Sequence, residues 1–253
     1  MGENKPKILV GAPTAAPYRY CLAEYATRVK ELSYPNYDVV LVDNSETEGY
    51  NEVIESQGLK AIHVPGFVSD SRERLATSRN VLREKVLQEG YDYLLSLEQD
   101  VIPPKDIIEI LLQHKKKVMT GVYFKPVLLN LAHKGEVVKQ VKKLMPLLGG
   151  FIPGMGEKMH WFSAKEITGR KVMQVRFSGL GCILIHRDVL EKIKFRVEKR
   201  VHCHDDVWFC HDLYEKGIAL FCDTYVKCKH LLKEKPKNLF LDCKRDFNPN
   251  LIV

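Results

Sequence analysis

The feature that most constrains the fold is an alternation of short apolar strands and amphipathic helices through the first half of the chain. Strand patterns are found at 7–11, 38–43, 61–64, 91–97 and 117–124. Helical spacing of apolar residues marks the segments between them at 20–32, 72–88 and 105–113. Such alternation is typical of right-handed βαβ units. The sequence therefore predicts an α/β fold, with a mostly parallel sheet flanked by helices.

We expect residues 1–253 to form a single domain, because no linker or internal repeat divides the chain. The alternating pattern continues to about residue 125 and loosens over 126–176, which we interpret as an insertion. Within it, we expect the basic stretch 137–144 to be helical, and a Gly-rich run follows at 148–156. Strand order returns at 177, in the half that ends in a Lys-rich tail.

Composition narrows the class of protein. Hydrophobic residues make up 45% and charged residues 28%, which favours a globular protein over a disordered chain or coiled coil. The net charge of +7 attracts anions such as phosphates but is too small to indicate a nucleic-acid partner. No transmembrane segment or secretory signal is recognisable, so we expect a cytoplasmic protein whose seven cysteines are free thiols.

Polar residues that follow the predicted strands are the first candidates for a site. Ligands of open α/β sheets bind outside the carboxyl ends of the strands. In this chain those positions hold Pro13 and Thr14, Asp43 and Asn44, and the triplet 98–100. We therefore expect these residues to lie around one site.

The triplet Glu98-Gln99-Asp100 directly follows an apolar strand. In extended backbone its two carboxylates would point to the same side. Both could face one divalent cation, or one could hold the cation while the other binds a sugar hydroxyl. A polar loop before Pro103 and Pro104 is the alternative interpretation.

A second group of ionisable residues lies at 202–211 and includes Asp205 and Asp206. This acidic pair precedes a predicted helix at 207–215, where capping and the helix dipole account for one carboxylate. They do not account for so many ionisable groups together. His230 follows another strand-like segment at 223–229.

The order of these motifs over 6–232 resembles glycosyltransferases of the GT-A fold, in particular the family 2-like group. The matching segments are the strand ending near Pro13, 42–45, the Arg79-Asn80 pair, 95–101, the Gly-rich strand 178–184, the acidic pair and His230. Two departures are notable. Glu98 stands where the group has its first Asp, and Asp205-Asp206 replaces the usual Glu-Asp.

The resemblance implies metal-dependent transfer of a sugar from a nucleoside diphosphate sugar, UDP- or GDP-linked, to an acceptor hydroxyl. It implies Mn²⁺ or Mg²⁺ bound by Asp100, Glu98 and His230, and a general base at Asp206 or Asp205. The donor would be bound by Pro13, Thr14, Asp43, Asn44, Arg79, Gln99 and Gly179. The insertion 126–176 matches nothing in the group and would shape the site for a glycan, lipid-linked or small-molecule acceptor.

The sequence also allows three other interpretations. A sugar-phosphate nucleotidyltransferase would need a basic loop after the first strand, and 11–16 has no Lys or Arg. A zinc-stabilised module could draw on the His and Cys residues between 202 and 243, although no C-x-x-C pair exists. The Lys-rich tail, 227–245, could bind nucleic acid or an anionic membrane; peripheral contact with the inner membrane face would also suit a lipid-linked acceptor.

Overall fold

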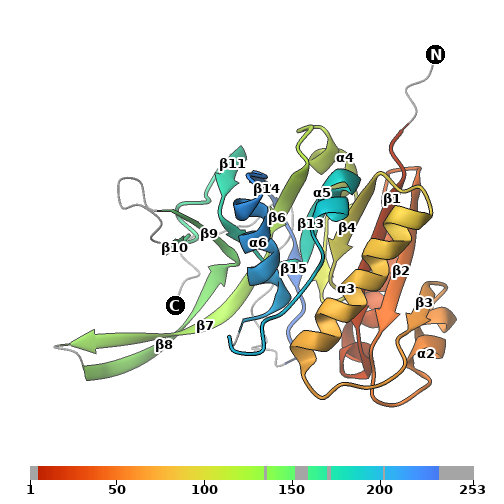
Figure 1. Ribbon diagram of the computed structural model, residues 1–253. Helices are drawn as coiled ribbons and strands as arrows, with labels where there is room; N and C mark the ends of the chain where they lie inside the picture. Colours follow the sequence, from red (N-terminus) through yellow and green to blue (C-terminus); the bar gives the residue numbers. More distant parts are fainter. Residues whose placement is uncertain (1–4, 134–135, 152–158, 170–171, 202, 234–253) are drawn as a thin grey trace.

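The computed structural model describes residues 5–133, 136–151, 159–169, 172–201 and 203–233 (Figure 1). Its centre is an eight-stranded sheet in the order β11-β14-β6-β13-β4-β1-β2-β3. Only β13 and β11 run antiparallel to the others, so the predicted α/β fold with a mostly parallel sheet is confirmed. The strands are β1 (Ile8–Thr14), β2 (Tyr37–Asp43), β3 (Lys60–His63), β4 (Tyr93–Leu97), β6 (Val118–Val122), β11 (Val172–Val175), β13 (Cys182–His186) and β14 (Leu220–Lys227).

Helices cover both faces of this sheet. One face packs against α3 (Ser71–Gln88), α5 (Arg187–Lys192) and α6 (Asp205–Glu215), which lie in front of the sheet in Figure 1. The other packs against α1 (Leu22–Lys30), α2 (Tyr50–Ser56) and α4 (Ile107–Leu112). Neighbouring strand residues alternate between the two cores: Leu9 joins the first, and Ile8 and Val10 join the second. Burial on both faces explains why these strands read as continuous apolar runs.

The helix over 72–88 is confirmed, and its ends follow from local chemistry. Asp70 caps α3 by accepting a hydrogen bond from the Arg72 amide at 2.9 Å. Gly90 ends it with a φ of 72°, a left-handed conformation that glycine adopts without strain. The predicted helix at 20–32 is shorter, because a 3-10 turn, η1 (Ala16–Cys21), precedes α1.

The helix expected at 137–144 is wrong, because this stretch lies in a strand of a long hairpin. Strands β7 (Phe124–His133) and β8 (Glu136–Pro146) pair antiparallel from Phe124↔Pro146 to His133↔Glu136 and project from the body (Figure 1). The β-branched residues of this stretch suit a strand, and cross-strand pairing outweighs its helical spacing.

Beyond the hairpin, the insertion contributes β9 (Leu148–Phe151) and β10 (Met159–Trp161) to a small sheet and β11 to the edge of the main sheet. Strand β9 pairs with β10 and with β12 (Phe177–Ser178). The expected Gly-rich run therefore begins as a strand, while its positions 152–156 fall outside the described residues.

Three further expectations concern the Lys-rich tail, membrane-spanning segments and the cysteines. Residues 234–253, which hold most of the Lys-rich tail, lie outside the described residues. Within the described part, no helix combines the length and apolar character that a bilayer span requires. The six cysteines that the structure describes are free thiols.

Close packing of α3 on β1 supports the whole arrangement and can be tested. A Cβ added at Gly11 of β1 would lie 2.7 Å from Cδ2 of Leu82, a fully buried residue of α3. We expect Leu82→Ala to lower the free energy of unfolding by about 2–5 kcal/mol, because the cavity cannot fully collapse. Thr77→Ala, on the exposed side of the same helix, is the matched control. Equal urea midpoints for the two variants would contradict this packing.

Candidate active site

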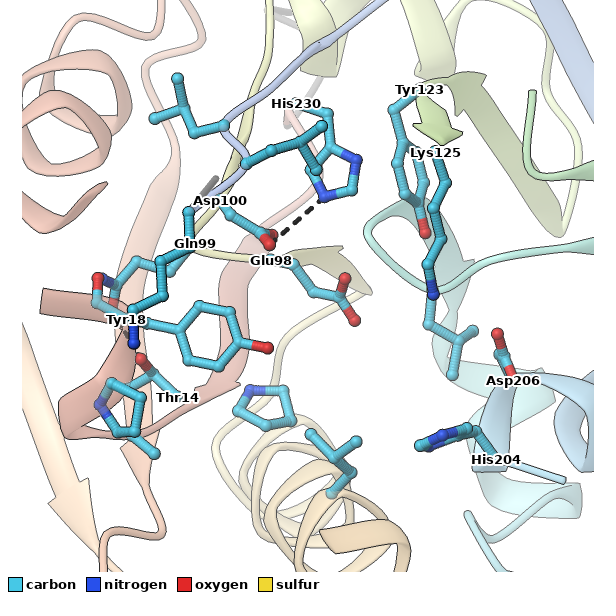
Figure 2. Close-up of a pocket in the computed structure, with 18 of the residues that line it drawn as sticks. Thr14, Tyr18, Glu98, Gln99, Asp100, Tyr123, Lys125, His204, Asp206 and His230 are labelled. Carbon is cyan, nitrogen blue, oxygen red and sulfur yellow. Dashed lines mark hydrogen bonds and ion pairs between the residues drawn. The ribbon is translucent and has the colours of Figure 1, made fainter. Parts of the chain in front are cut away.

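A cavity of about 490 Å³ opens at the carboxyl ends of β1 and β4 and beside the start of α6 (Figure 2). Except for Asp43 and Gly179, every residue predicted for the site lines it. These lining residues are Pro13, Thr14, Asn44, Arg79, Glu98, Gln99, Asp100, Asp205, Asp206 and His230. Residues from distant parts of the chain therefore meet around one space.

The triplet after β4 is a turn and not extended backbone, so the reasoning from alternate positions is wrong. The Val101 amide donates to the Glu98 carbonyl at 2.8 Å and closes this turn. The turn nevertheless directs the Glu98 and Asp100 side chains into the cavity (Figure 2). Gln99, 2% exposed, instead accepts from Thr14 Oγ1 at 2.6 Å and donates to the Tyr18 carbonyl at 2.7 Å. Gln99 thus ties the turn to the loop after β1.

His230 reaches Asp100 because two short strands pair next to the turn. Strand β15 (Lys229–His230) runs antiparallel to β5 (Val101–Ile102), and the Leu231 amide donates to the Asp100 carbonyl at 2.7 Å. His230 Nε2 lies 3.3 Å from Asp100 Oδ2, and its Nδ1 lies 2.7 Å from the Phe124 carbonyl. Because a carbonyl only accepts, Nδ1 carries a proton and Nε2 faces the cavity.

The electrostatics of this pair favour a charged histidine when no other cation is near. Burial by itself would lower the pKa of His230, but the hydrogen bond and negative charge of Asp100 outweigh burial and raise it. A cation bound between the two side chains would take over the role of that proton.

Arg79 is the buried centre of the site. Its guanidinium, 2% exposed, donates to Asp205 Oδ2 at 2.8 Å and forms a short ion pair with Glu98 Oε1. Burial raises the pKa of Glu98 in spite of Arg79, and the charges of Asp100 and Asp205 raise it further. Arg79 therefore binds carboxylates of the protein itself. Its expected contact with a donor stays a prediction.

The acidic pair at the start of α6 divides into two environments. Asp205 is 2% exposed and held by Arg79. Asp206 lies on the far side of the cavity from Asp100 and His230, with His204 beside it (Figure 2). Burial, followed by the charge of Asp205, raises the pKa of Asp206 above its ordinary value. Asp206 is therefore the member of the pair that Arg79 does not hold, and its role as the base stays a prediction.

Asp43 and Gly179 do not line the cavity but contact residues next to it or in its wall. Asp43 is fully buried and accepts hydrogen bonds from the Ser45 amide and hydroxyl, at 2.9 and 2.5 Å, while His63 Nδ1 lies 3.1 Å away. A Cβ at Gly179 would lie 2.1 Å from the Tyr123 hydroxyl oxygen, so glycine leaves room for that ring. Direct donor contacts by these two residues stay predictions.

Sequence reasoning missed several cavity residues, among them Tyr18, Tyr123 and Lys125. Tyr123 and Lys125 follow β6 directly, so the rule about carboxyl ends of strands could have found them. Tyr18 lies in η1, whose 3-10 turn the helical pattern did not predict. His204 was part of the ionisable group but was not assigned a role.

The donor set at Asp100 and His230 fits a divalent cation that also binds substrate. Within the described residues, no three His, Cys, Asp or Glu side chains form a metal-binding cluster. Two protein ligands are nevertheless enough for Mg²⁺ or Mn²⁺, which complete their coordination with phosphate oxygens and water. Glu98 as a third ligand stays a prediction, since Arg79 binds its Oε1. The described His and Cys residues thus give the zinc module no cluster, while His202 and Cys243 lie outside them.

Comparison with solved structures identifies the fold. GalNAc-T7 with UDP, GalNAc and Mn²⁺ aligns over 91% of this chain and 44% of its own, with a TM-score of 0.62 and 13% identity. TarS 1–349 of S. aureus in complex with UDP-GlcNAc aligns over 93% of this chain and 62% of its own, with a TM-score of 0.54 and 14% identity. A197 from STIV aligns over 90% and 86%, with a TM-score of 0.48 and 16% identity.

The likeness to GalNAc-T7 and TarS shows that the chain has the GT-A fold, as the order of its motifs predicts. The chain spans less than two thirds of the length of either protein. No protein-family model and no curated protein sequence matches it.

Removal of Arg79 tests its structural role. We expect Arg79→Met to lower the free energy of unfolding by about 3–5 kcal/mol, because Glu98 and Asp205 lose their buried counter-charge. Arg28→Met removes a surface pair with Glu31, whose members are 30% and 43% exposed, and should cost at most about 1 kcal/mol. Urea unfolding measures both. Similar losses in the two variants would show that Arg79 contributes no more than a surface charge.

Proposed function

We propose that the protein transfers a sugar from a nucleoside diphosphate sugar to an acceptor hydroxyl, with Mn²⁺ or Mg²⁺ as cofactor. The observation that carries this proposal is that Asp100 and His230 face Asp206 across one cavity (Figure 2). This arrangement supports a cation and a diphosphate bound on one side of the cavity and a base on the other. The GT-A fold supports the same class of reaction.

The nucleoside would bind at the end of the cavity formed by the loops after β1 and β2. Pro13, Thr14 and Asn44 line this end, and the exposed ring of Tyr18 stands beside them. Thr14 and Asn44 are held by hydrogen bonds to Gln99 and Ser78, so their positions are set before a ligand arrives. GalNAc-T7 and TarS were solved with UDP and UDP-GlcNAc, which favours a UDP-sugar over a GDP-sugar.

The residues of the chain would then share the chemistry as follows. A cation held by Asp100 and His230 would supply positive charge to the departing diphosphate. Asp206 would take the proton of the acceptor hydroxyl as its oxygen attacks the sugar, if the reaction inverts the anomeric centre. Asp205 would hold Arg79, which leaves Asp206 as the base.

The acceptor would approach from the side of the β7–β8 hairpin, where Lys125 and Leu147 line the cavity. A glycan, a lipid-linked molecule or a small hydroxyl compound would all suit this open side. We propose that the reaction takes place in the cytoplasm. A lipid-linked acceptor would require the protein to attach to the inner membrane face, through its basic tail.

A thermal-shift series tests the donor and the cation together. We expect UDP to raise the melting temperature of the wild type with Mn²⁺ far more than without it, and more than GDP, CDP or dTDP do. Asp100→Asn should abolish the metal-dependent part of this shift, because the neutral amide removes a charged ligand of the cation. Asp38→Asn, on β2 and outside the cavity, is the control. An unchanged shift in Asp100→Asn would contradict the assignment of the cation site.

The acid limb of the rate profile tests Asp206. Because the neutral carboxyl cannot accept a proton, kcat/KM should fall as pH falls through a pKa above the ordinary 3.8. Asp206→Asn should reduce kcat by roughly 100-fold or more, in the range of general-base catalysis. Donor affinity, measured by calorimetry, should stay near that of the wild type. An equal loss of kcat and donor affinity would contradict the role of base.

The same carboxyl provides a readout that does not depend on turnover. Since its pKa is raised in the folded state, its contribution to stability is complete below the unfolded pKa and is lost as pH rises through the folded value. Asp206→Asn should therefore flatten the decline in stability over that window. A decline as steep as that of the wild type would show that Asp206 does not titrate there.

A further inference from the structure

The residue between β6 and β7 and the first two residues of β7 lie in the region around His230. The Tyr123 ring meets the His230 ring edge to face, with centroids 5.5 Å apart. The Phe124 carbonyl accepts the Nδ1 proton of His230 at 2.7 Å. Lys125, the next residue, extends its side chain into the cavity (Figure 2). The bond to His230 therefore fixes the backbone from which Lys125 projects.

Lys125 is a cation in the cavity that the protein does not neutralise. Its side chain reaches in beside Tyr123 and toward Asp206 (Figure 2), and it forms no ion pair or hydrogen bond with any residue in the described part of the chain. Arg79, by contrast, is engaged by two carboxylates. A flexible ammonium among several carboxylates would ordinarily pair with one of them. Its freedom leaves it available to a ligand.

We propose that Lys125 binds the phosphoryl oxygens of the donor diphosphate, from the side of the cavity formed by Tyr123. This inference rests on the proposed function. In the transfer, the bond from the anomeric carbon to the diphosphate oxygen breaks and the bond to the acceptor oxygen forms. The electron pair goes to the diphosphate, and the acceptor proton goes to Asp206. Lys125 then faces the negative charge that grows on the leaving group.

This assignment also gives the hairpin a function. Lys125 is the second residue of β7, so the hairpin begins at the residue that would touch the leaving group. A phosphoryl group could also belong to the acceptor, because the acceptor would enter from the same side. Binding of inorganic pyrophosphate, compared with the effect on an acceptor, distinguishes these two sources.

The test uses the full chain with Mg²⁺ and titrates inorganic pyrophosphate and UDP by calorimetry. We expect Lys125→Met to weaken both roughly tenfold or more, the loss of one charged hydrogen bond. The same variant should weaken the binding of UMP, which lacks the second phosphate, far less. Lys125→Arg should retain most of the affinity for pyrophosphate and UDP. Lys142→Met, at an exposed position on the other strand of the hairpin, is the matched control. Melting temperatures of the variants should match the wild type.

The outcomes separate this proposal from the proposed function. Equal pyrophosphate affinity in the wild type and Lys125→Met, or no pyrophosphate binding by the wild type, would overturn the role of Lys125. A variant that changed only the KM of a phosphorylated acceptor would overturn it as well. Failure of the wild type to bind UDP or GDP, with a pyrophosphate site that Lys125→Met weakens, would remove the proposed function and retain the anion site.

Discussion

The Arg79 guanidinium joins the two halves of the cavity, because it binds Glu98 from the turn after β4 and Asp205 from the first turn of α6. Burial of one charge is costly, and here each charge has a partner close by. With Glu98 and Asp205 held in this way, the remaining carboxylates of the site, Asp100 and Asp206, face the cavity from opposite sides. Glu98 and Asp205 are therefore engaged by Arg79, whereas Asp100 and Asp206 remain available to a ligand.

The same logic extends outward from Arg79 to the backbone. Asp100 is set by the turn that Gln99 ties to Thr14, and His230 is set by the pairing of β15 with β5. The Phe124 carbonyl fixes the proton of His230, and the next residue is Lys125. The proposed cation site, leaving-group contact and base are thus attached to one framework of buried bonds, which favours a preorganised site over one assembled by the ligand.

Much of the core could be predicted from sequence, and the hairpin could not. Strands buried on both faces leave continuous apolar runs, and α3 is marked by a capping Asp70 and a terminal Gly90. The stretch 137–144 has helical spacing, yet it pairs as a strand with residues 126–132, and the helical period carries no information about that partner. For the site, position after a strand found Thr14, Asn44 and Asp100, while the buried role of Asp43 depends on Ser45 and His63.

Residue patterns alone were enough to predict the α/β class, the edge of the sheet where the cavity opens, and most of the polar residues that line it. These depend on periodicity and on the direction of parallel strands, both of which are local properties. The folded chain was needed to show that Arg79 holds Glu98 and Asp205, that Asp206 faces Asp100 across the cavity, and that Lys125 enters the same space. Those outcomes depend on distances between side chains that lie far apart along the chain, which no local pattern in the sequence contains.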